Sequence, residues 1–202
     1  MTLYDTSSAT ATVLRNPNFN MRIISGKYKG RTIKIPKGIR PTQNKVRKAV
    51  FDILADVSGL RILELFAGSG AVGMEALSLG AAEAVFVEGR HSVAVVLRSN
   101  LSFLPEASYH LIFKDALKAI ARLSDGGEKF DLIFLDPPYY KGLAKKILQT
   151  ISGYDIVSAA GNIVVQCFRK DELPQAEGGI TCWKQARYGD TILAFYRVEK
   201  EH

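Results

Sequence analysis

The sequence has few of the residues that bind metals or form disulfide bonds. Its 202 residues include two cysteines and three histidines, and none of them lies at the short spacings typical of a metal site. Cys167 and Cys182 are therefore interpreted as free thiols in the core of an intracellular protein. We expect no metal cofactor, and no cysteine nucleophile because neither cysteine has a neighbouring base.

Long hydrophobic runs are missing as well. No stretch approaches the ~18 apolar residues of a transmembrane helix, and the N-terminus lacks the basic start and apolar core of a secretory signal. We therefore expect no membrane contact, a cytoplasmic location and a flexible tail over residues 1–20. Apolar residues make up 47% of the chain, as in ordinary globular proteins, and the length fits one domain with a small appendage.

Acidic residues are absent from the segment Met21–Val50, which contains ten lysines and arginines. Subtracting these ten charges from the net +7 leaves −3 for the rest of the chain. Such one-sided charge is typical of a surface that binds a polyanion such as nucleic acid, although a solvated basic face is the alternative. The residues of this segment predicted to contact the nucleic acid are Arg22, Lys27, Tyr28, Lys29, Arg31 and Arg47.

The same segment contains signals for local structure. Arg22–Pro36 is predicted to form two short strands around a turn at Gly26–Gly30. Tyr28 lies between two lysines, so it can stack on a base while they bind phosphate. Thr42 is predicted to cap a helix whose apolar stripe, Val46, Val50, Phe51 and Leu54, has helical spacing.

Strands and helices alternate along the rest of the chain. Predicted strands are Arg61–Leu65, Ala84–Val87, Tyr109–Phe113, Asp131–Leu135 and Asn162–Cys167, with helices around Val72–Leu79, Ser92–Leu101, Leu117–Leu123 and Gly142–Ile151. Two further strands, Gly179–Lys184 and Thr191–Val198, follow closely and suggest an antiparallel hairpin. We predict an α/β fold: a mostly parallel, seven-stranded Rossmann-like sheet with helices on both faces. Ligands of such sheets bind beyond the carboxyl ends of the strands.

A glycine-rich loop follows the first strand of this sheet. Gly68, Gly70 and Gly73 form a G-x-G-x-x-G pattern, and Glu88 ends the next strand where a ribose-binding acid is expected. This pattern alone favours a dinucleotide-dependent oxidoreductase. Glu64, four residues before Gly68, opposes that interpretation because its carboxylate would repel a pyrophosphate and suits a ligand carrying positive charge.

The fourth strand ends in the motif Asp136-Pro137-Pro138-Tyr139. An amino group attached to an aromatic ring is a poor nucleophile, because its lone pair is delocalised into the ring. Asp136 and the carbonyl of Pro137 are two acceptors that can orient such an amine, and the prolines fix their own φ. Tyr139 can stack on the base, and positioning of this kind contributes several kcal/mol to catalysis. A strand cap followed by a proline turn is the structural alternative.

Together these motifs resemble class I S-adenosylmethionine-dependent methyltransferases that act on ring-conjugated nitrogens. The resemblance implies S-adenosylmethionine as the cofactor, with the group to be methylated held by Asp136, Pro137, Pro138 and Tyr139. Its implied cofactor-binding residues are Glu64, Phe66, Ala67, Gly68, Ser69, Gly70, Glu88, Asp115 and Ala116. Glu88 would bind the ribose and Asp115 the adenine amine, although Asp115 can also cap the helix beginning near Leu117.

From Arg22 onward, the blocks RIISGKYKGRTIKIP, RPTQNKVRKAVFDIL and YGDTILAFYR resemble the bacterial 16S ribosomal RNA guanine-N2 methyltransferases (RsmD type). This resemblance implies methylation of a guanine of 16S ribosomal RNA by a monomer acting on a partly assembled small ribosomal subunit. It also implies that Arg40 and Thr42 contact the RNA near the donor, and that the basic hairpin holds the RNA backbone. The predicted organisation is a tail (1–20), a basic RNA-binding hairpin and helix (21–58), and a methyltransferase domain (59–202). Two departures from the family pattern are Lys48 after Arg47, and Gly89-Arg90 after Glu88.

Three other functions remain open from the sequence. A DNA adenine-N6 methyltransferase would share the motifs but needs a larger target-recognition region than this chain provides. A dinucleotide oxidoreductase would use the glycine loop, and has no need of the Asp-Pro-Pro-Tyr motif. A non-catalytic RNA-binding assembly factor would use the basic segment alone.

Overall fold

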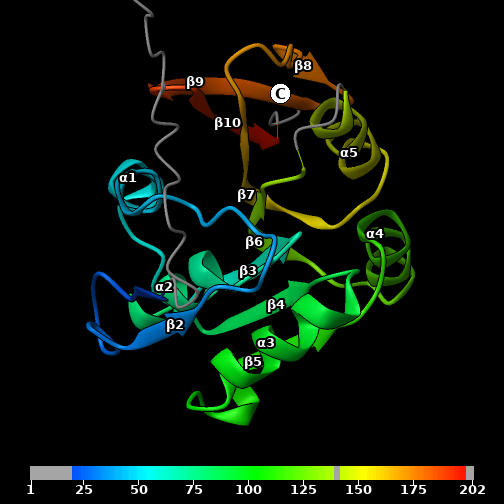
Figure 1. Ribbon diagram of the computed structural model, residues 1–202. Coiled ribbons are helices and arrows are strands. Elements are labelled where there is room, and N and C mark those ends of the chain that lie inside the picture. The colour runs from blue at the N-terminus through cyan, green and yellow to red at the C-terminus, as the bar shows by residue number, and fades with distance from the viewer. Residues whose placement is uncertain (1–19, 139–141, 199–202) are drawn as a thin grey trace, which may run out of the picture.

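A single mixed β-sheet forms the centre of the molecule (Figure 1). The computed structural model describes residues 20–138 and 142–198. The strands of this sheet are β3 (Arg61–Leu65), β4 (Glu83–Val87), β5 (Tyr109–Ile112), β6 (Phe130–Leu135), β7 (Val157–Phe168), β8 (Ala176–Glu177), β9 (Ile180–Tyr188) and β10 (Thr191–Val198). Their spatial order is β5-β4-β3-β6-β7-β10-β9-β8. The first five strands in this order, from β5 to β7, are parallel to one another, and β10 is antiparallel to both β7 and β9.

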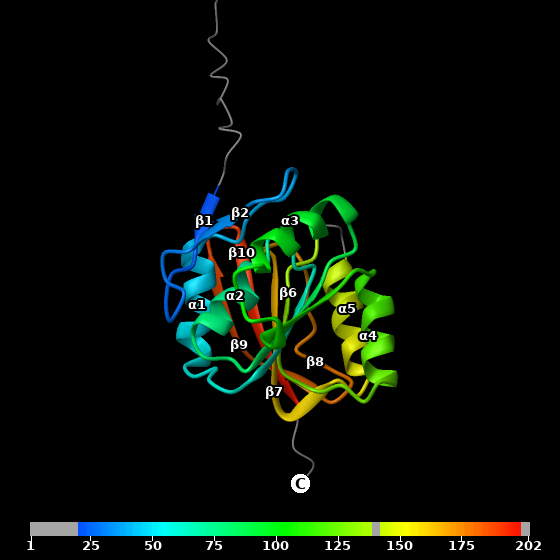
Figure 2. The ribbon, with the colours of Figure 1, turned by 90° about the horizontal axis from the view of Figure 1, so that it is seen from below.

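Helices cover both faces of the sheet. They are α1 (Asn44–Leu54), α2 (Ala71–Ser78), α3 (His91–Leu101), α4 (Ala116–Asp125) and α5 (Leu143–Ser152), with a 3₁₀ turn at Glu106–Ser108. Alternating side chains of β3 face opposite ways: Ile62 belongs to the core under α1, α2 and α3, while Leu63 and Leu65 belong to the core under α4 and α5. Figure 2 shows α4 and α5 on the opposite side of the sheet from α1 and α2.

The N-terminal hairpin packs against the helices of one face. It consists of β1 (Asn20–Arg22) and β2 (Thr32–Lys34), paired antiparallel. At its turn, Gly26 has a φ of 73°, and a Cβ added there would lie 1.8 Å from the carbonyl oxygen of Ser78 at the end of α2. Only glycine therefore permits this close approach. The hairpin contributes Met21, Ile23 and Ile33 to the same hydrophobic core as the sheet. The predicted domain boundary at residue 58 therefore stays a prediction.

The predicted Rossmann-like sheet and C-terminal antiparallel hairpin are confirmed, with two differences in detail. The sheet has an eighth strand because the two-residue β8 pairs with the edge of β9. Helix α1 begins one residue later than expected: its N-cap is Gln43, whose side chain makes no capping bond, so the predicted cap at Thr42 is wrong. No helix within residues 20–138 and 142–198 has the length and apolar character needed to span a membrane.

Candidate active site

A cavity of about 720 Å³ lies at the carboxyl ends of β3, β4 and β6. The chain reverses its direction of travel across the sheet between β3 and β6, and ligands of open α/β sheets bind at such a point. The volume lies in the usual range for small-molecule sites. The predicted residues that line the cavity are Arg40, Thr42, Glu64, Phe66, Ala67, Gly68, Ser69, Glu88, Asp115, Ala116, Asp136, Pro137 and Pro138. Gly70 is not among them; it is buried as the N-cap of α2.

Glu64 lies on β3, and its carboxylate reaches the first turn of α2. Its carboxylate accepts hydrogen bonds from the backbone N–H groups of Val72 at 3.4 Å and Gly73 at 2.8 Å. Burial is the main cause that raises the pKa of Glu64 to about 8; the Asp136 carboxylate contributes to the rise, while the two N–H donors and the charge of Arg47 oppose it. The free amides that a pyrophosphate would use at a helix N-terminus are therefore already bonded to a carboxylate.

Glu88 holds the glycine loop in place. It is buried at the end of β4, and its two carboxylate oxygens accept from the N–H of Gly68 at 3.0 Å and of Arg90 at 2.8 Å. A carboxylate oxygen has two lone pairs, so each retains capacity for a ribose hydroxyl. Its predicted ribose contact stays a prediction.

Asp115 begins α4 at the far end of the cavity. Its side chain accepts hydrogen bonds from the backbone N–H groups of Leu117 at 3.0 Å and Lys118 at 3.3 Å, which confirms the predicted N-cap. The second oxygen of the carboxylate is not used by the cap. The two expected roles of Asp115 are therefore compatible, and contact with an adenine amine stays a prediction.

Asp136 is anchored from three directions. The side-chain amide of Gln166 donates to its Oδ2 at 2.8 Å, the Thr42 hydroxyl donates another bond, and the charge of Arg40 lies nearby. Burial nevertheless raises the pKa of Asp136 to about 7, against the opposing effects of Arg40, Thr42 and Gln166. A carboxyl group with this pKa is poised to change its charge near neutral pH.

The prolines after Asp136 complete this wall of the cavity. Pro137 is buried and Pro138 exposed, and both line the cavity. Tyr139 lies outside the described residues, so its predicted stacking on a base stays a prediction.

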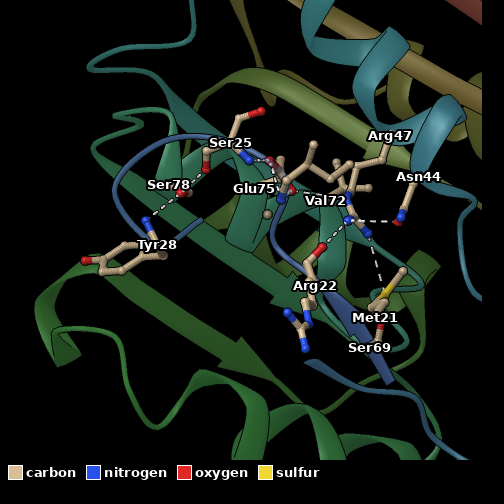
Figure 3. Close-up of polar contacts among 12 residues, drawn as sticks. Met21, Arg22, Ser25, Tyr28, Asn44, Arg47, Ser69, Val72, Glu75 and Ser78 are labelled. Carbon is tan, nitrogen blue, oxygen red and sulfur yellow. Dashed lines mark hydrogen bonds and ion pairs between the residues drawn. The ribbon is translucent and has the colours of Figure 1, made fainter. Parts of the chain in front are cut away.

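Arg47, predicted to contact RNA, is instead a core residue (Figure 3). Its side chain is 0% exposed. Its Nε donates to Glu75 of α2 at 3.1 Å, its Nη2 donates to the carbonyl of Arg22 and the side-chain oxygen of Asn44, and its Nη1 donates to the sulfur of Met21. Burial lowers the pKa of Arg47, while Glu75 opposes that change. The RNA-contact prediction is wrong for this residue because a buried, fully paired guanidinium offers nothing to a phosphate.

Glu75 uses the rest of its carboxylate to fasten the hairpin. It accepts from the backbone N–H groups of Ile24 and Ser25, at distances of 2.7–3.1 Å. Ser78, one turn later on α2, donates its hydroxyl to the Ser25 carbonyl and accepts from the N–H of Tyr28, as Figure 3 shows. The basic hairpin is thus attached to the helix that begins at the cofactor loop.

The other predicted RNA contacts divide between the surface and the cavity. Arg22, Lys27, Lys29 and Arg31 are exposed, whereas Arg40 and Thr42 line the cavity. Tyr28 is half-buried, with its ring edge-on to Phe103 at 5.4 Å between centroids. The loop between β2 and α1 therefore connects a basic surface directly to the cavity wall.

Among the cavity-lining residues that the sequence analysis missed, two are buried and polar. Gln166 of β7 and Thr191 at the start of β10 both line the cavity and are buried. The available signal was the single glutamine inside the apolar run Ile163–Cys167, where a polar side chain needs a partner. Thr191 gave no such signal, because threonine is common in strands.

The cavity fits S-adenosylmethionine better than a dinucleotide. Four acidic side chains, those of Glu64, Glu88, Asp115 and Asp136, line it, and in their ionised forms they suit a ligand with a positive sulfonium, an ammonium group and ribose hydroxyls. The α2 amides that would bind pyrophosphate are occupied by Glu64. No group of three or more residues that could hold a metal occurs in the described part of the chain.

Comparisons with known proteins agree with this geometry. The family model described as "Conserved hypothetical protein 95" matches residues 21–197. YlbH of Bacillus subtilis (strain 168), provisionally named an rRNA methyltransferase, is 36% identical over 88% of this chain and 98% of its own. Ribosomal RNA small subunit methyltransferase D of Escherichia coli (strain K12) is 29% identical over 93% of this chain and 97% of its own. Among solved structures, a hypothetical protein from Thermus thermophilus superposes with a TM-score of 0.76 at 31% identity, covering 89% of this chain and 99% of that one.

Proposed function

This chain belongs to the family described as "Conserved hypothetical protein 95", the RsmD-type methyltransferases, and on that premise we propose that it methylates the exocyclic N2 amine of a guanine in 16S ribosomal RNA. Ribosomal RNA is the substrate in the names of its relatives. The observation that carries the proposal is the anchored carboxylate of Asp136, followed by Pro137, in the cavity that also contains Glu64 and Glu88.

S-adenosylmethionine is the methyl donor. The residues that would hold it are Glu64 at its methionine end, Glu88 at its ribose and Asp115 at its adenine. When bound, it supplies an electrophilic methyl carbon activated by a positively charged sulfur. Asp136 lies close enough to Glu64 for its charge to raise the pKa of the Glu64 carboxyl, so the two ends of the reaction are adjacent in the cavity.

Asp136 and Pro137 orient the guanine amine. The Asp136 carboxylate accepts one N–H of the amine and the Pro137 carbonyl accepts the other, which directs the nitrogen lone pair away from the ring. Gln166 and Thr42 keep Asp136 in one orientation, so little reorganisation is needed on binding. The N2 atom gains a carbon and loses a proton, and the pKa of Asp136, near 7, makes its carboxylate a suitable acceptor for that proton.

The basic segment brings RNA to this site. Nine of its ten lysines and arginines are exposed, and the tenth is the buried Arg47. The segment also contributes Arg40 to the cavity wall. A positively charged surface of this kind binds backbone phosphates without sequence specificity. We infer that the substrate is a partly assembled small ribosomal subunit in the cytoplasm, and that the protein acts on it as a monomer.

The test is transfer of label from tritiated S-adenosylmethionine to small subunits from cells lacking the endogenous enzyme, followed by digestion of the RNA to nucleosides. We expect label in N2-methylguanosine. In a parallel reaction with DNA in place of small subunits, label in N6-methyldeoxyadenosine would contradict the proposal in favour of a DNA methyltransferase. A rise in melting temperature with NAD and none with S-adenosylmethionine would favour a dinucleotide enzyme instead.

A further inference from the structure

Gln166 is a polar residue in the middle of a buried strand. It lies on β7 in the run Ile163–Cys167, and 5% of it is exposed. Its Nε2 donates to Oδ2 of Asp136 at 2.8 Å, and its side chain lines the same cavity. The amide is therefore part of the wall against which the proposed substrate amine would lie.

The other end of this amide has no partner. Oε1 of Gln166 is the one buried side-chain nitrogen or oxygen without a hydrogen bond in residues 20–138 and 142–198. The orientation is fixed by chemistry, since an ionised Asp136 only accepts and the amide must present its nitrogen to it. Leaving a buried acceptor unsatisfied is costly, and each such atom in a native protein calls for an explanation, of which a functional role is one and a bound water or ion another.

Two neighbouring acceptors select a particular base edge. The Asp136 carboxylate and the Gln166 Oε1 atom together suit a substrate that presents two adjacent N–H donors. Guanine does so, with N1–H beside the N2 amine. Adenine presents its N6 amine beside an N1 acceptor, and cytosine its N4 amine beside an N3 acceptor, so in either base a lone pair would face Oε1.

We propose that Gln166 is a specificity-determining residue: its Oε1 accepts a hydrogen bond from N1–H of guanine, while Asp136 accepts a hydrogen bond from the N2 amine. The inference rests on the proposed function, and explains how one cavity would distinguish guanine from the other amino-bearing bases. Nε2 and Oε1 belong to one planar amide, so the same side chain can donate to Asp136 through Nε2 and present Oε1 to the base. On binding, the unpartnered oxygen then acquires its donor.

The experiment compares two targets and two proteins. Small subunits are reconstituted with ligated 16S RNA that carries either guanine or 2-aminopurine at the methylated position, and kcat/KM is measured for wild type and Gln166→Leu. The analogue 2-aminopurine keeps the N2 amine but has an acceptor at N1. Its loss of O6 affects both proteins alike and cancels in the cycle. We expect wild type to prefer guanine, and Gln166→Leu to reduce that preference by roughly ten- to hundredfold.

Controls separate specificity from general damage. Gln185→Leu changes an exposed glutamine on β9 and should leave the preference unchanged. If Gln166→Leu does not fold, as judged by its melting curve, the nearly isosteric Gln166→Met replaces it. Equal loss of activity on both targets, with an unchanged preference, would reduce Gln166 to a support for Asp136 and overturn the inference. Methylation of neither RNA by wild type, with donor bound, would overturn the proposed function and this inference together.

Discussion

Replacing Asp136 with asparagine removes a titrating charge from the cavity but keeps an oxygen that accepts hydrogen bonds. The pKa of Asp136 rises from 3.8 to about 7 in the folded protein because of burial. At 1.36 kcal/mol for each pH unit, the shift corresponds to a loss of folding stability of at most about 4 kcal/mol on ionisation. Asp136 is partly exposed to solvent, which makes the loss smaller. Because the folded pKa exceeds the unfolded one, stability falls as pH rises from about 4 to 7 and is then level. Asp136→Asn should therefore be more stable than wild type at pH 8 and similar at pH 4.

Activity should change in the opposite direction. The ionised carboxylate is the stronger acceptor for the amine, so wild-type kcat should rise with pH to a plateau with a midpoint near 7. Measurement at saturating donor keeps the titration of Glu64, whose pKa is about 8, from dominating the profile. The kcat of Asp136→Asn should be roughly tenfold below the wild-type plateau and should lack the rise with pH centred near 7.

The assays are urea denaturation at pH 4 and pH 8, and initial rates of methyl transfer between pH 5.5 and 8.5. A variant no more stable than wild type at pH 8 would show that burial does not penalise the Asp136 charge. A wild-type profile that is flat from pH 6 to 8 would refute the assignment of Asp136 as the titrating acceptor.

Three further changes probe the hairpin and its attachment. Arg47→Met leaves Glu75 buried without its charge partner and should destabilise the protein by about 3–5 kcal/mol in urea denaturation. Gly26→Ala places a methyl group against the Ser78 carbonyl at a positive φ and should cost about 1–3 kcal/mol by the same measurement. The triple alanine variant of Lys27, Lys29 and Arg31 should bind ribosomal RNA more weakly in filter binding. The slope of log K against log salt concentration should be smaller in magnitude by about 2–3.

Matched controls accompany these variants. Lys48→Ala removes an exposed partner of Asp52 on the same helix as Arg47, and should change stability by less than about 0.5 kcal/mol; an equally small effect of Arg47→Met would contradict the buried pair. Gly30→Ala also has a positive φ but meets no atom within 4 Å, so a cost equal to that of Gly26→Ala would show that the clash is unimportant. An unchanged salt slope would return the basic hairpin to a solubility role.

The sequence contains enough to predict the sheet and the place of the site. The strands Arg61–Leu65 and Thr191–Val198 have the predicted bounds, because apolar runs bordered by glycine or charge are local signals. Parallel strands bring their carboxyl ends to one edge, so Glu64, Glu88 and Asp136 could be assigned to one cavity without knowing any contact distance.

Polar residues inside apolar patterns were the part that could not be predicted. Arg47 shares a helical face with Phe51 and Leu54, so its spacing pointed inward, but its partner Glu75 is 28 residues away and only the tertiary fold brings them together. Gln166 is similar: its position in an apolar strand signalled a partner, and Asp136, 30 residues earlier, supplies it. Long-range pairing of this kind is not encoded in local pattern.

The most direct test of the central claim is a comparison of wild type with Asp136→Ala, using tritiated S-adenosylmethionine and unmethylated small subunits. Calorimetry gives the donor Kd of each protein, and nucleoside analysis of the digested RNA gives the product. The account predicts equal donor Kd values, label in N2-methylguanosine with wild type, and none with the variant. Full transfer by Asp136→Ala would contradict the claim that this carboxylate holds the amine for methylation.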